Sequence, residues 1–253
     1  MPHDPGRVLL VGASPGSADL LTVRAARAVE QAQALLYDAL VPQEILDLAP
    51  TNCLKIQTGK RAGRTSMAQT TINRLMVRLA RRGLNVVRLK GGDPSVFGRV
   101  GEEMAALRAA GIEAQVIPGV TAAAAAAAQF GFPLTHRGQA RRVVLTTARL
   151  DQGSLAEDWR AAADPEATLA IYMGGAAAGP IRDRLLAAGR PAATPVLAVE
   201  NAGRPEARLF TGVLAGLAKM IPSDLDGPVL IVVGEVAARA VARQPELLKE
   251  LAS

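Results

Sequence analysis

The chain has one cysteine, Cys53, and two histidines among its 253 residues. A single cysteine excludes an internal disulfide and a thiolate metal cage, and two histidines argue against a histidine-rich metal site. Aromatic residues make up only 3% of the chain, which argues against a stacking surface for single-stranded nucleic acid. No apolar run is long enough to span a bilayer, and the N-terminus lacks the pattern of a signal peptide. These absences predict a soluble cytoplasmic protein without a metal.

The charge of the chain leaves two classes of partner open. A net charge of +6 is compatible with a nucleic-acid partner. The basic residues are scattered among acidic ones, except in the clusters Lys60–Arg64 and Arg137–Arg142. Both clusters lie beside glycines, and they suit a polyanionic small molecule as well as a phosphate backbone.

Hydrophobic residues make up 49% of the chain and form short runs that alternate with helical patterns in its first half. Short apolar strands separated by helices predict a parallel sheet that is covered on both faces. The expected strands are 7–11, 34–37, 53–56, 86–89 and 114–117, and the expected helices are 22–33 and 66–82.

A break at Pro118-Gly119 opens a different pattern. An alanine-rich helix is expected at 121–129, and a solvated terminal helix at 235–253. Two of the later strands are joined by a short polar loop and predict a hairpin, so the second sheet is expected to be mixed. The sequence thus predicts two α/β domains, 1–118 and 119–253, with later strands at 142–146, 168–172, 195–199, 208–211 and 229–233.

The most informative run is Gly91–Pro94, which follows a buried apolar strand and precedes Phe97–Arg99. Ligands bind at the carboxyl ends of strands in α/β sheets, and paired glycines let a ligand approach the backbone. The Asp93 carboxylate can accept hydrogen bonds from a hydroxyl pair or an amino group. A helix is expected to start directly after Pro94. The alternative is a tight strand-to-helix turn in which Asp93 caps that helix.

Two further segments suggest a ligand site. Gly12–Gly16 follows the first strand but lacks the Lys-Ser/Thr of a P-loop and the three-glycine dinucleotide spacing. It is interpreted as the wall of a nucleoside pocket stiffened by Pro15, or alternatively as a simple turn. The seven alanines of Ala122–Ala128 form a closely packed helix, whose small side chains are expected to leave room for a ligand between the domains.

Charged residues at strand ends suggest proton chemistry. Asp38 follows the second strand and Lys60 follows the third, so a parallel sheet would present both at one edge. Such a pair can move a proton, although a surface ion pair is the commoner role for these residue types. Arg137 can bind carboxylates bidentately, whereas its neighbour His136 is interpreted as a structural residue.

These motifs occur in one order: Gly12–Gly16, Tyr37-Asp38, Gly59–Gly63, Gly91–Arg99, Pro118–Thr121, Pro133–Gly138 and Tyr172–Gly174. Over residues 7–236 the chain resembles the tetrapyrrole methylase family, and within it the branch that methylates uroporphyrinogen III. The resemblance implies two α/β domains with the cofactor in the cleft between them, usually as a homodimer. It implies methyl transfer from S-adenosylmethionine to carbons 2 and 7 of the substrate, giving precorrin-2 for siroheme and cobalamin synthesis. No metal is implied.

The resemblance also implies roles for individual residues. Asp38 would be the proton acceptor and Lys60 the proton donor. The cofactor site would be lined by Pro15, Gly91, Gly92, Asp93, Val96, Thr121, Ala122, Met173 and Ala202. The substrate carries eight carboxylates, and charge and placement alone predict that they are held by Arg61, Arg64, Arg99 and Arg137.

The chain departs from the family pattern in three segments: Ser14 and Ser17 replace a more usual glycine and aspartate, Ala39 replaces a usual arginine, and Ala148-Arg149 replaces Gly-His. These changes are expected to affect the identity of the substrate more than the binding of the cofactor. The alternatives are a methyltransferase for a later precorrin, a basic nucleic-acid-binding protein, and a protein that binds the cofactor without transferring a methyl group. The leading interpretation expects neither a nucleic-acid nor a membrane partner.

Overall fold

The computed structural model describes residues 6–59, 67–148, 162 and 164–241. The chain divides into two compact units. The first comprises Met1–Ala122 with Gly203–Pro205, and the second comprises Ala123–Ala202 with Glu206–Ser253.

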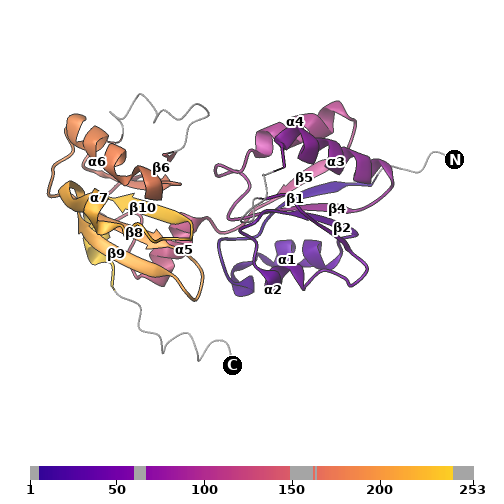
Figure 1. Cartoon of the computed structure of the whole chain (residues 1–253), viewed down its shortest axis with the longest axis horizontal. Helices are drawn as coiled ribbons and strands as arrows, with labels where there is room; N and C mark the ends of the chain where they lie inside the picture. The colour runs from indigo at the N-terminus through magenta and orange to yellow at the C-terminus, as the bar shows by residue number, and fades with distance from the viewer. Residues whose placement is uncertain (1–5, 60–66, 149–161, 163, 242–253) are drawn as a thin grey trace. The chain divides into compact units, whose positions relative to one another are not determined.

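The first unit is built on a five-stranded sheet in the order β3-β2-β4-β1-β5 (Figure 1). All of its strand pairs are parallel. This confirms the parallel sheet that the alternation of short apolar runs and helices predicted. The strands are β1 (Val8–Gly12), β2 (Ala34–Tyr37), β3 (Leu54–Gln57), β4 (Val86–Lys90) and β5 (Ala114–Ile117).

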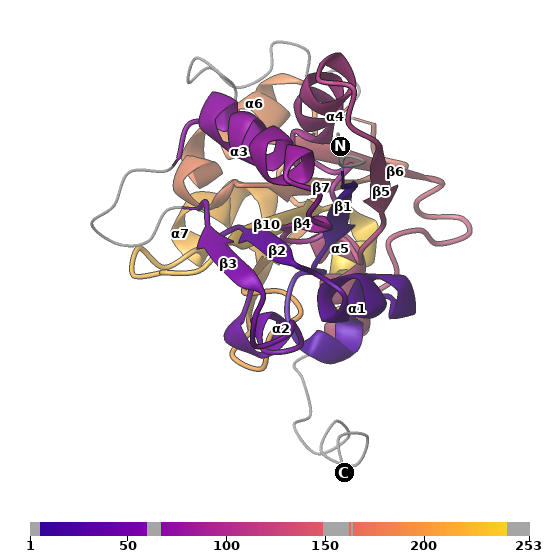
Figure 2. The ribbon, with the colours of Figure 1, turned by 90° about the vertical axis from the view of Figure 1, so that its right-hand side faces the viewer.

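Helices cover both faces of this sheet, as Figures 1 and 2 show. Along β4, Val87 and Leu89 point toward α1 (Val23–Glu30) and α2 (Gln43–Leu46), because successive strand residues face opposite sides. Val86 points the other way, toward α3 (Gln69–Arg81) and α4 (Val100–Ala109). A short 3₁₀ turn, η1 (Ala18–Leu20), precedes α1, and the Thr22 hydroxyl caps that helix by accepting the Ala25 amide.

The second unit contains a mixed sheet in the order β6-β7-β10-β8-β9. Only β6 and β7 pair in parallel, and the remaining pairs are antiparallel. The predicted hairpin is the antiparallel pair β8–β9, so both the mixed sheet and the hairpin are confirmed. The strands are β6 (Arg142–Thr147), β7 (Ala167–Tyr172), β8 (Pro195–Glu200), β9 (Arg208–Val213) and β10 (Val229–Val233).

One face of the second sheet packs against α6 (Ala178–Ala187) and α7 (Leu217–Met220), through Ile181, Leu185 and Leu217. The alanine-rich helix α5 (Ala122–Gln129) begins where the two units divide. Short 3₁₀ segments complete the unit: η3 (Gly175–Ala177), η4 (Leu214–Gly216) and η5 (Glu235–Arg239).

One expectation was wrong. No helix starts directly after Pro94, because the chain makes turns up to Arg99, whose left-handed conformation (φ 57°) precedes the first residue of α4. Of the solvated helix expected at 235–253, residues 242–253 lie outside the described residues. The described start of this segment is η5, in which Val236 and Ala237 are buried. Among the residues described here, no helix is both long and apolar enough to cross a membrane.

Candidate functional site

The carboxyl ends of β1, β4 and β5 form the candidate site of the first unit. After β1 the chain continues into α1 on one face of the sheet, whereas after β4 it continues into α4 on the opposite face. Because β1 and β4 are neighbours, their connections separate at this point, which is where open α/β sheets typically bind ligands.

Three loops meet at this edge through their backbones. Ser14 and Gly92 exchange amide hydrogen bonds of 3.1 and 2.9 Å. A Cβ on Gly119 would lie 2.4 Å from the Gly92 carbonyl oxygen, and one on Gly12 would lie 2.5 Å from the Gly119 amide nitrogen. Glycine is therefore needed at these positions for the loops to approach one another.

Gly92 offers the open surface that a bound cofactor needs. Its φ of 71° is in the left-handed region, which favours glycine, and a Cβ built there would meet nothing within 4 Å. Gly91 packs against the Leu40 side chain, where a Cβ would come within 3.3 Å. A half-buried glycine pair beside an apolar side chain fits the nucleoside part of a cofactor such as S-adenosylmethionine.

Asp93 joins the loops together. Its Oδ2 accepts the Gly119 amide at 3.0 Å, and its Oδ1 accepts the amide of Ser95 at 2.8 Å and the Ser95 hydroxyl. Asp93 is therefore not the cap of α4, as the alternative interpretation held, because that helix starts seven residues later at Val100. A carboxylate has about four acceptor positions, so roughly one remains for a ligand.

Backbone strain is concentrated in the predicted motifs. Left-handed backbone costs a non-glycine residue about 1–2 kcal/mol and is often retained at functional sites. In the described ranges, every non-glycine residue with positive φ belongs to a predicted motif or adjoins a predicted site residue: Ser14, Phe97, Arg99, Met173 and Asn201. This distribution is independent of the resemblance and supports the same segments.

The remaining predicted cofactor residues fall on both units. Pro15 packs against Gly203, where a Cβ would lie 2.8 Å from the proline Cγ, and Gly203 directly follows the buried Ala202. Val96 closes a turn by donating its amide to the Asp93 carbonyl at 3.1 Å. Thr121 and Ala122 continue from the Gly119 loop, whereas Met173 lies after β7 in the second unit.

The predicted proton acceptor Asp38 directly follows β2 and is about one third exposed. Its Oδ1 accepts Arg88 Nη2 at 2.5 Å, and the Thr58 hydroxyl lies 3.5 Å away. The β2–β3 adjacency that motivated the pairing with Lys60 is confirmed. Lys60 itself, like Arg61 and Arg64, lies outside the described residues.

Sequence reasoning missed the buried partners of Asp38. Arg88 and Lys90 both bind Oε1 of Glu103, at 3.1 and 2.9 Å, and all three side chains are buried. The signal was available in the pattern, because positions 86, 88 and 90 of a strand share one face. Two cations on the helix-covered face of a central strand require a buried anion.

The two described substrate-binding candidates differ. Arg99 forms a bidentate ion pair with Glu102 at 2.7 and 2.8 Å, and hydrogen bonding to Arg99 lowers the pKa of that carboxyl group. A substrate carboxylate would have to compete with Glu102. Arg137 is exposed, and its carbonyl oxygen lies 2.9 Å from Nδ1 of His136.

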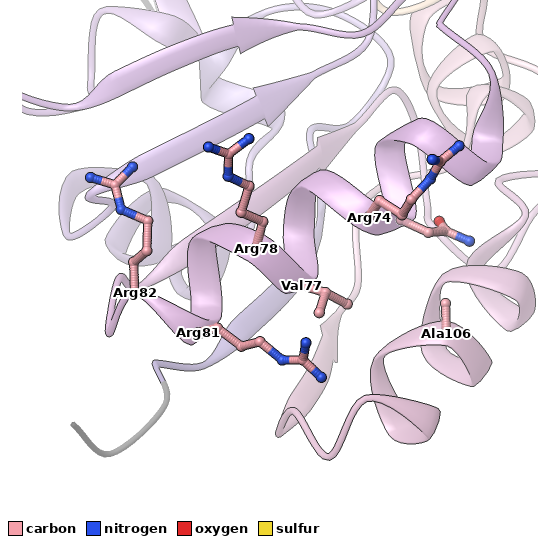
Figure 3. A pocket seen from close by; sticks show the side chains of 7 residues that line it. Arg74, Val77, Arg78, Arg81, Arg82 and Ala106 are labelled. Atoms are coloured by element: carbon pink, nitrogen blue, oxygen red, sulfur yellow. The ribbon is translucent and has the colours of Figure 1, made fainter. Parts of the chain in front are cut away.

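A separate groove of about 550 Å³ lies between α3 and α4. Figure 3 shows guanidinium groups along α3, with Ala106 of α4 beside them. No sequence prediction included this groove, although the spacing of its arginines along a helix is visible in the chain. It is away from the carboxyl ends of the strands, because the C-terminal end of α3 leads into the start of β4. Its lining comprises Asn73, Arg74, Val77, Arg78, Arg81, Arg82 and Ala106.

Comparison with known proteins decides the family. The sequence profile of the tetrapyrrole (corrin/porphyrin) methylases matches residues 7–218. The chain belongs to this family. The resemblance proposed from the motifs is thereby confirmed.

This methylase is 46% identical over 231 residues to siroheme synthase 1 of Cronobacter sakazakii, an alignment that covers 91% of this chain and 49% of that protein. It is also 46% identical over 237 residues to the siroheme synthase of Sodalis glossinidius, covering 94% and 50%. The chain therefore spans about half the length of the curated relatives it matches.

Solved structures give the same family. The uroporphyrin-III C-methyl transferase of Thermus thermophilus, described as complexed with S-adenyl homocysteine, has a TM-score of 0.80 and 40% identity. That alignment covers 92% of this methylase and 99% of the other chain. A cobalt precorrin-4 methyltransferase has a TM-score of 0.82 and 26% identity, with 91% and 95% covered.

Proposed function

We propose that this methylase transfers methyl groups from S-adenosylmethionine to carbons 2 and 7 of uroporphyrinogen III, giving precorrin-2 for siroheme or cobalamin synthesis. The observation that carries the proposal is the meeting of the loops after β1, β4 and β5, with the open Gly92 peptide at their centre. The comparison with the Thermus thermophilus enzyme supports the cofactor, since that structure is described as a complex with S-adenyl homocysteine.

The cofactor contacts are assigned to Pro15, Gly91, Gly92, Asp93, Val96, Thr121, Ala122, Met173 and Ala202. The glycine loops would receive the nucleoside part, and the remaining acceptor position of Asp93 would bind a hydroxyl or amino group. The cofactor supplies an activated methyl group on a sulfonium. The strained backbone at Ser14 and Met173 supports this assignment, since strain is retained where a site requires it.

The chemistry requires alignment and the removal of a proton. The substrate carbon supplies an electron pair for the new carbon–carbon bond, while the sulfur–methyl pair stays on sulfur. The methylated macrocycle then loses one proton, which Asp38 accepts. A proton that Lys60 donates to one position of the macrocycle is balanced by a further proton lost from another position, so the net loss stays at one. Holding the reactants in line accounts for most of the acceleration in such reactions, and a positioned base contributes about 10²–10⁴-fold.

The eight carboxylates of the substrate explain the charge of the protein. Arg61, Arg64, Arg99 and Arg137 are the assigned carboxylate ligands. Bidentate arginine pairs give geometric specificity that lysine does not. Ala39 removes one arginine that is usual in the family, so the remaining arginines carry more of the binding.

The second candidate is a methyltransferase for a later precorrin, and the likeness to the cobalt precorrin-4 enzyme favours it in fold. Sequence identity favours the first candidate, at 40% against 26%. Incubation with S-adenosylmethionine and each macrocycle in turn separates the two. Methylation of uroporphyrinogen III supports the proposal, whereas methylation of a later precorrin alone contradicts it.

We further propose a cytoplasmic homodimer, as the family resemblance implies. Light scattering on the purified protein should give twice the mass of 26.3 kDa. A mass of one chain at micromolar concentration would contradict the dimer.

A further inference from the structure

Four charged side chains form a continuous line inside the first unit. Lys90 Nζ lies 2.9 Å from Oε1 of Glu103, Glu103 Oε1 lies 3.1 Å from Arg88 Nε, and Arg88 Nη2 lies 2.5 Å from Oδ1 of Asp38. Gln69 of α3 also donates to Glu103 Oε1, at 3.1 Å. We call Asp38, Arg88, Glu103 and Lys90 the charged line.

Burying the side chains of the charged line costs free energy, so their presence calls for an explanation. Arg88 and Lys90 are each 3% exposed and Glu103 is fully buried, so these charges must be paired to remain inside. Burial, followed by the nearby charge of Arg88, lowers the pKa of Lys90. Replacing such groups with apolar ones is often neutral for stability or better. If the charged line served only to stabilise the fold, apolar side chains would serve as well, so its ion pairs indicate another role.

Only one end of the charged line reaches solvent, and it is Asp38, with 32% of its side chain exposed. The opposite end lies under the candidate loop, because a Cβ on Gly98 would come within 3.2 Å of the Lys90 Cε. The charged line is neutral overall. The two cations, Arg88 and Lys90, are matched by two carboxylates, the buried Glu103 and the partly exposed Asp38.

Arg88 fixes the direction of the Asp38 carboxylate. Its planar guanidinium donates through Nε to Glu103, through Nη1 to the Leu89 carbonyl at 3.2 Å, and through Nη2 to Asp38. Three acceptors on separate groups leave this plane no rotation. Arg88 and Thr58 both approach Oδ1, so Oδ2 has no hydrogen-bond partner within the described part of the chain.

We propose that Arg88 is a positioning residue for methyl transfer, holding Asp38 so that its Oδ2 accepts the proton that the methylated macrocycle loses. Glu103 holds Arg88 in turn, and Lys90 holds Glu103. This inference rests on the proposed function, because it requires Asp38 to be the proton acceptor. The proton moves from a macrocycle carbon to Oδ2, and its bonding pair stays in the macrocycle.

The test is a double-mutant cycle on the full-length protein with Asp38→Asn, Arg88→Met and the double variant. Asp38→Asn should lower kcat by ~100-fold, the usual share of a general base. Arg88→Met should lower kcat by at least ~10-fold, because a small displacement of a reacting group costs this much. The KM for uroporphyrinogen III and the affinity for S-adenosylhomocysteine should stay within about twofold of wild type in both.

The decisive value is kcat of the double variant. If Arg88 acts through Asp38, the double variant is no slower than Asp38→Asn alone, since the effects are not independent. A double variant slowed by the product of the two single effects would overturn the inference. Should Arg88→Met fail to fold, Arg88→Lys takes its place in the cycle, since it keeps the charge but cannot span both carboxylates.

Two outcomes separate this inference from the proposed function. A wild-type protein that binds S-adenosylhomocysteine but methylates no macrocycle would overturn both. A wild-type protein that methylates uroporphyrinogen III, with Asp38→Asn equally active, would overturn only the roles of Asp38 and Arg88. The matched control is Arg108→Met, an exposed arginine on the same helix as Glu103, which should keep the wild-type kcat.

Discussion

At the scale of single residues, Ser14 shows how a departure from a family pattern can be accommodated. Its φ of 55° lies in the left-handed region, where a glycine would be unstrained. The serine hydroxyl compensates by donating to the Leu20 carbonyl at 2.8 Å and accepting the Val120 amide at 2.9 Å. The substitution therefore exchanges backbone freedom for hydrogen bonds between the loops.

We expect Ser14→Ala to be less stable than wild type by about 2 kcal/mol, because it loses two hydrogen bonds of about 1 kcal/mol each and keeps the strain. Ser14→Gly should lie within about 1 kcal/mol of wild type, since relief of strain offsets the lost bonds. Urea unfolding of the three proteins measures the difference. A Ser14→Ala protein as stable as wild type would contradict this explanation.

At the residue level, the sequence singles out candidates that follow a strand directly, whereas a side chain that serves a distant partner leaves no such signal. Asp38 and Asp93 were identified because each follows a strand in a parallel sheet. Arg88 was not, because its partners Asp38 and Glu103 come from elements 50 and 15 residues away. The shared strand face of Arg88 and Lys90 indicates that a buried anion is needed, but only tertiary packing determines which carboxylates supply it.

At the scale of elements, the loops after β1, β4 and β5 depend on one another through Asp93. We expect Asp93→Ala to abolish S-adenosylhomocysteine binding, because it releases the Gly119 amide and the Ser95 turn together. Asp38→Ala should keep the affinity and slow only the transfer, since Asp38 lies at the end of a different strand, β2. Calorimetry measures the affinity of both variants for S-adenosylhomocysteine.

The control for this prediction is Ser95→Ala, which removes the Ser95 hydroxyl contact to Asp93 but leaves the Gly119 bond in place. It should bind S-adenosylhomocysteine nearly as well as wild type. Unchanged affinity in Asp93→Ala would show that the loops hold together without the carboxylate.

In the second unit, Glu200 links β8, β9 and the loop before β10. Its Oε2 accepts Arg208 Nε at 2.6 Å and its Oε1 accepts the Gly227 amide at 2.9 Å. The hydrogen bond from Arg208 lowers the pKa of Glu200 below its ordinary value of 4.5. The folded state therefore binds this proton less readily than the unfolded state.

The stabilisation from Glu200 should be fully present above pH 4.5 and decline as pH falls through the lower folded pKa. Arg208 is 47% exposed, so screening makes the stabilisation from this ion pair small. Glu200→Gln should lose this small stabilisation at pH 7 and show a flatter decline of stability in acid. Urea midpoints measured from pH 3 to 7 test this. Parallel curves for the two proteins would contradict it.

Elements were predicted well where buried apolar strands leave a short, uninterrupted signal, as at Ala34–Tyr37 and Val229–Val233, which match the structure residue for residue. The start of α4 was missed for a physical reason. Phe97 and Arg99 adopt left-handed backbone, which no propensity of these residue types indicates, and the helix is delayed to Val100.

At the scale of the whole molecule, two surfaces of the first unit are expected to differ in what they bind. One is the strand edge, where a substrate with eight carboxylates is proposed to bind. The other is the arginine groove on α3, which holds Arg74, Arg78, Arg81 and Arg82 with no ion pair to any carboxylate in the described residues. We therefore expect that removing charge from the arginine groove and removing charge from the strand edge have different effects.

We expect the double variant Arg81→Ser/Arg82→Ser to elute from heparin at lower salt than wild type, since fewer counterions are released on binding. Its rate of methyl transfer should be unchanged, because these residues adjoin the start of β4 and the candidate site lies at its end. A loss of methyl transfer in this folded variant would contradict the location of the site.

The measurement that tests the central claim most directly is a count of methyl groups. The protein is incubated without oxygen with S-adenosylmethionine and freshly generated uroporphyrinogen III, and the product is analysed by mass spectrometry. We expect two added methyl groups, with Ala39 and Ala148 tolerated. No added methyl group, from a protein that still binds S-adenosylhomocysteine, would contradict the assignment of uroporphyrinogen III as substrate.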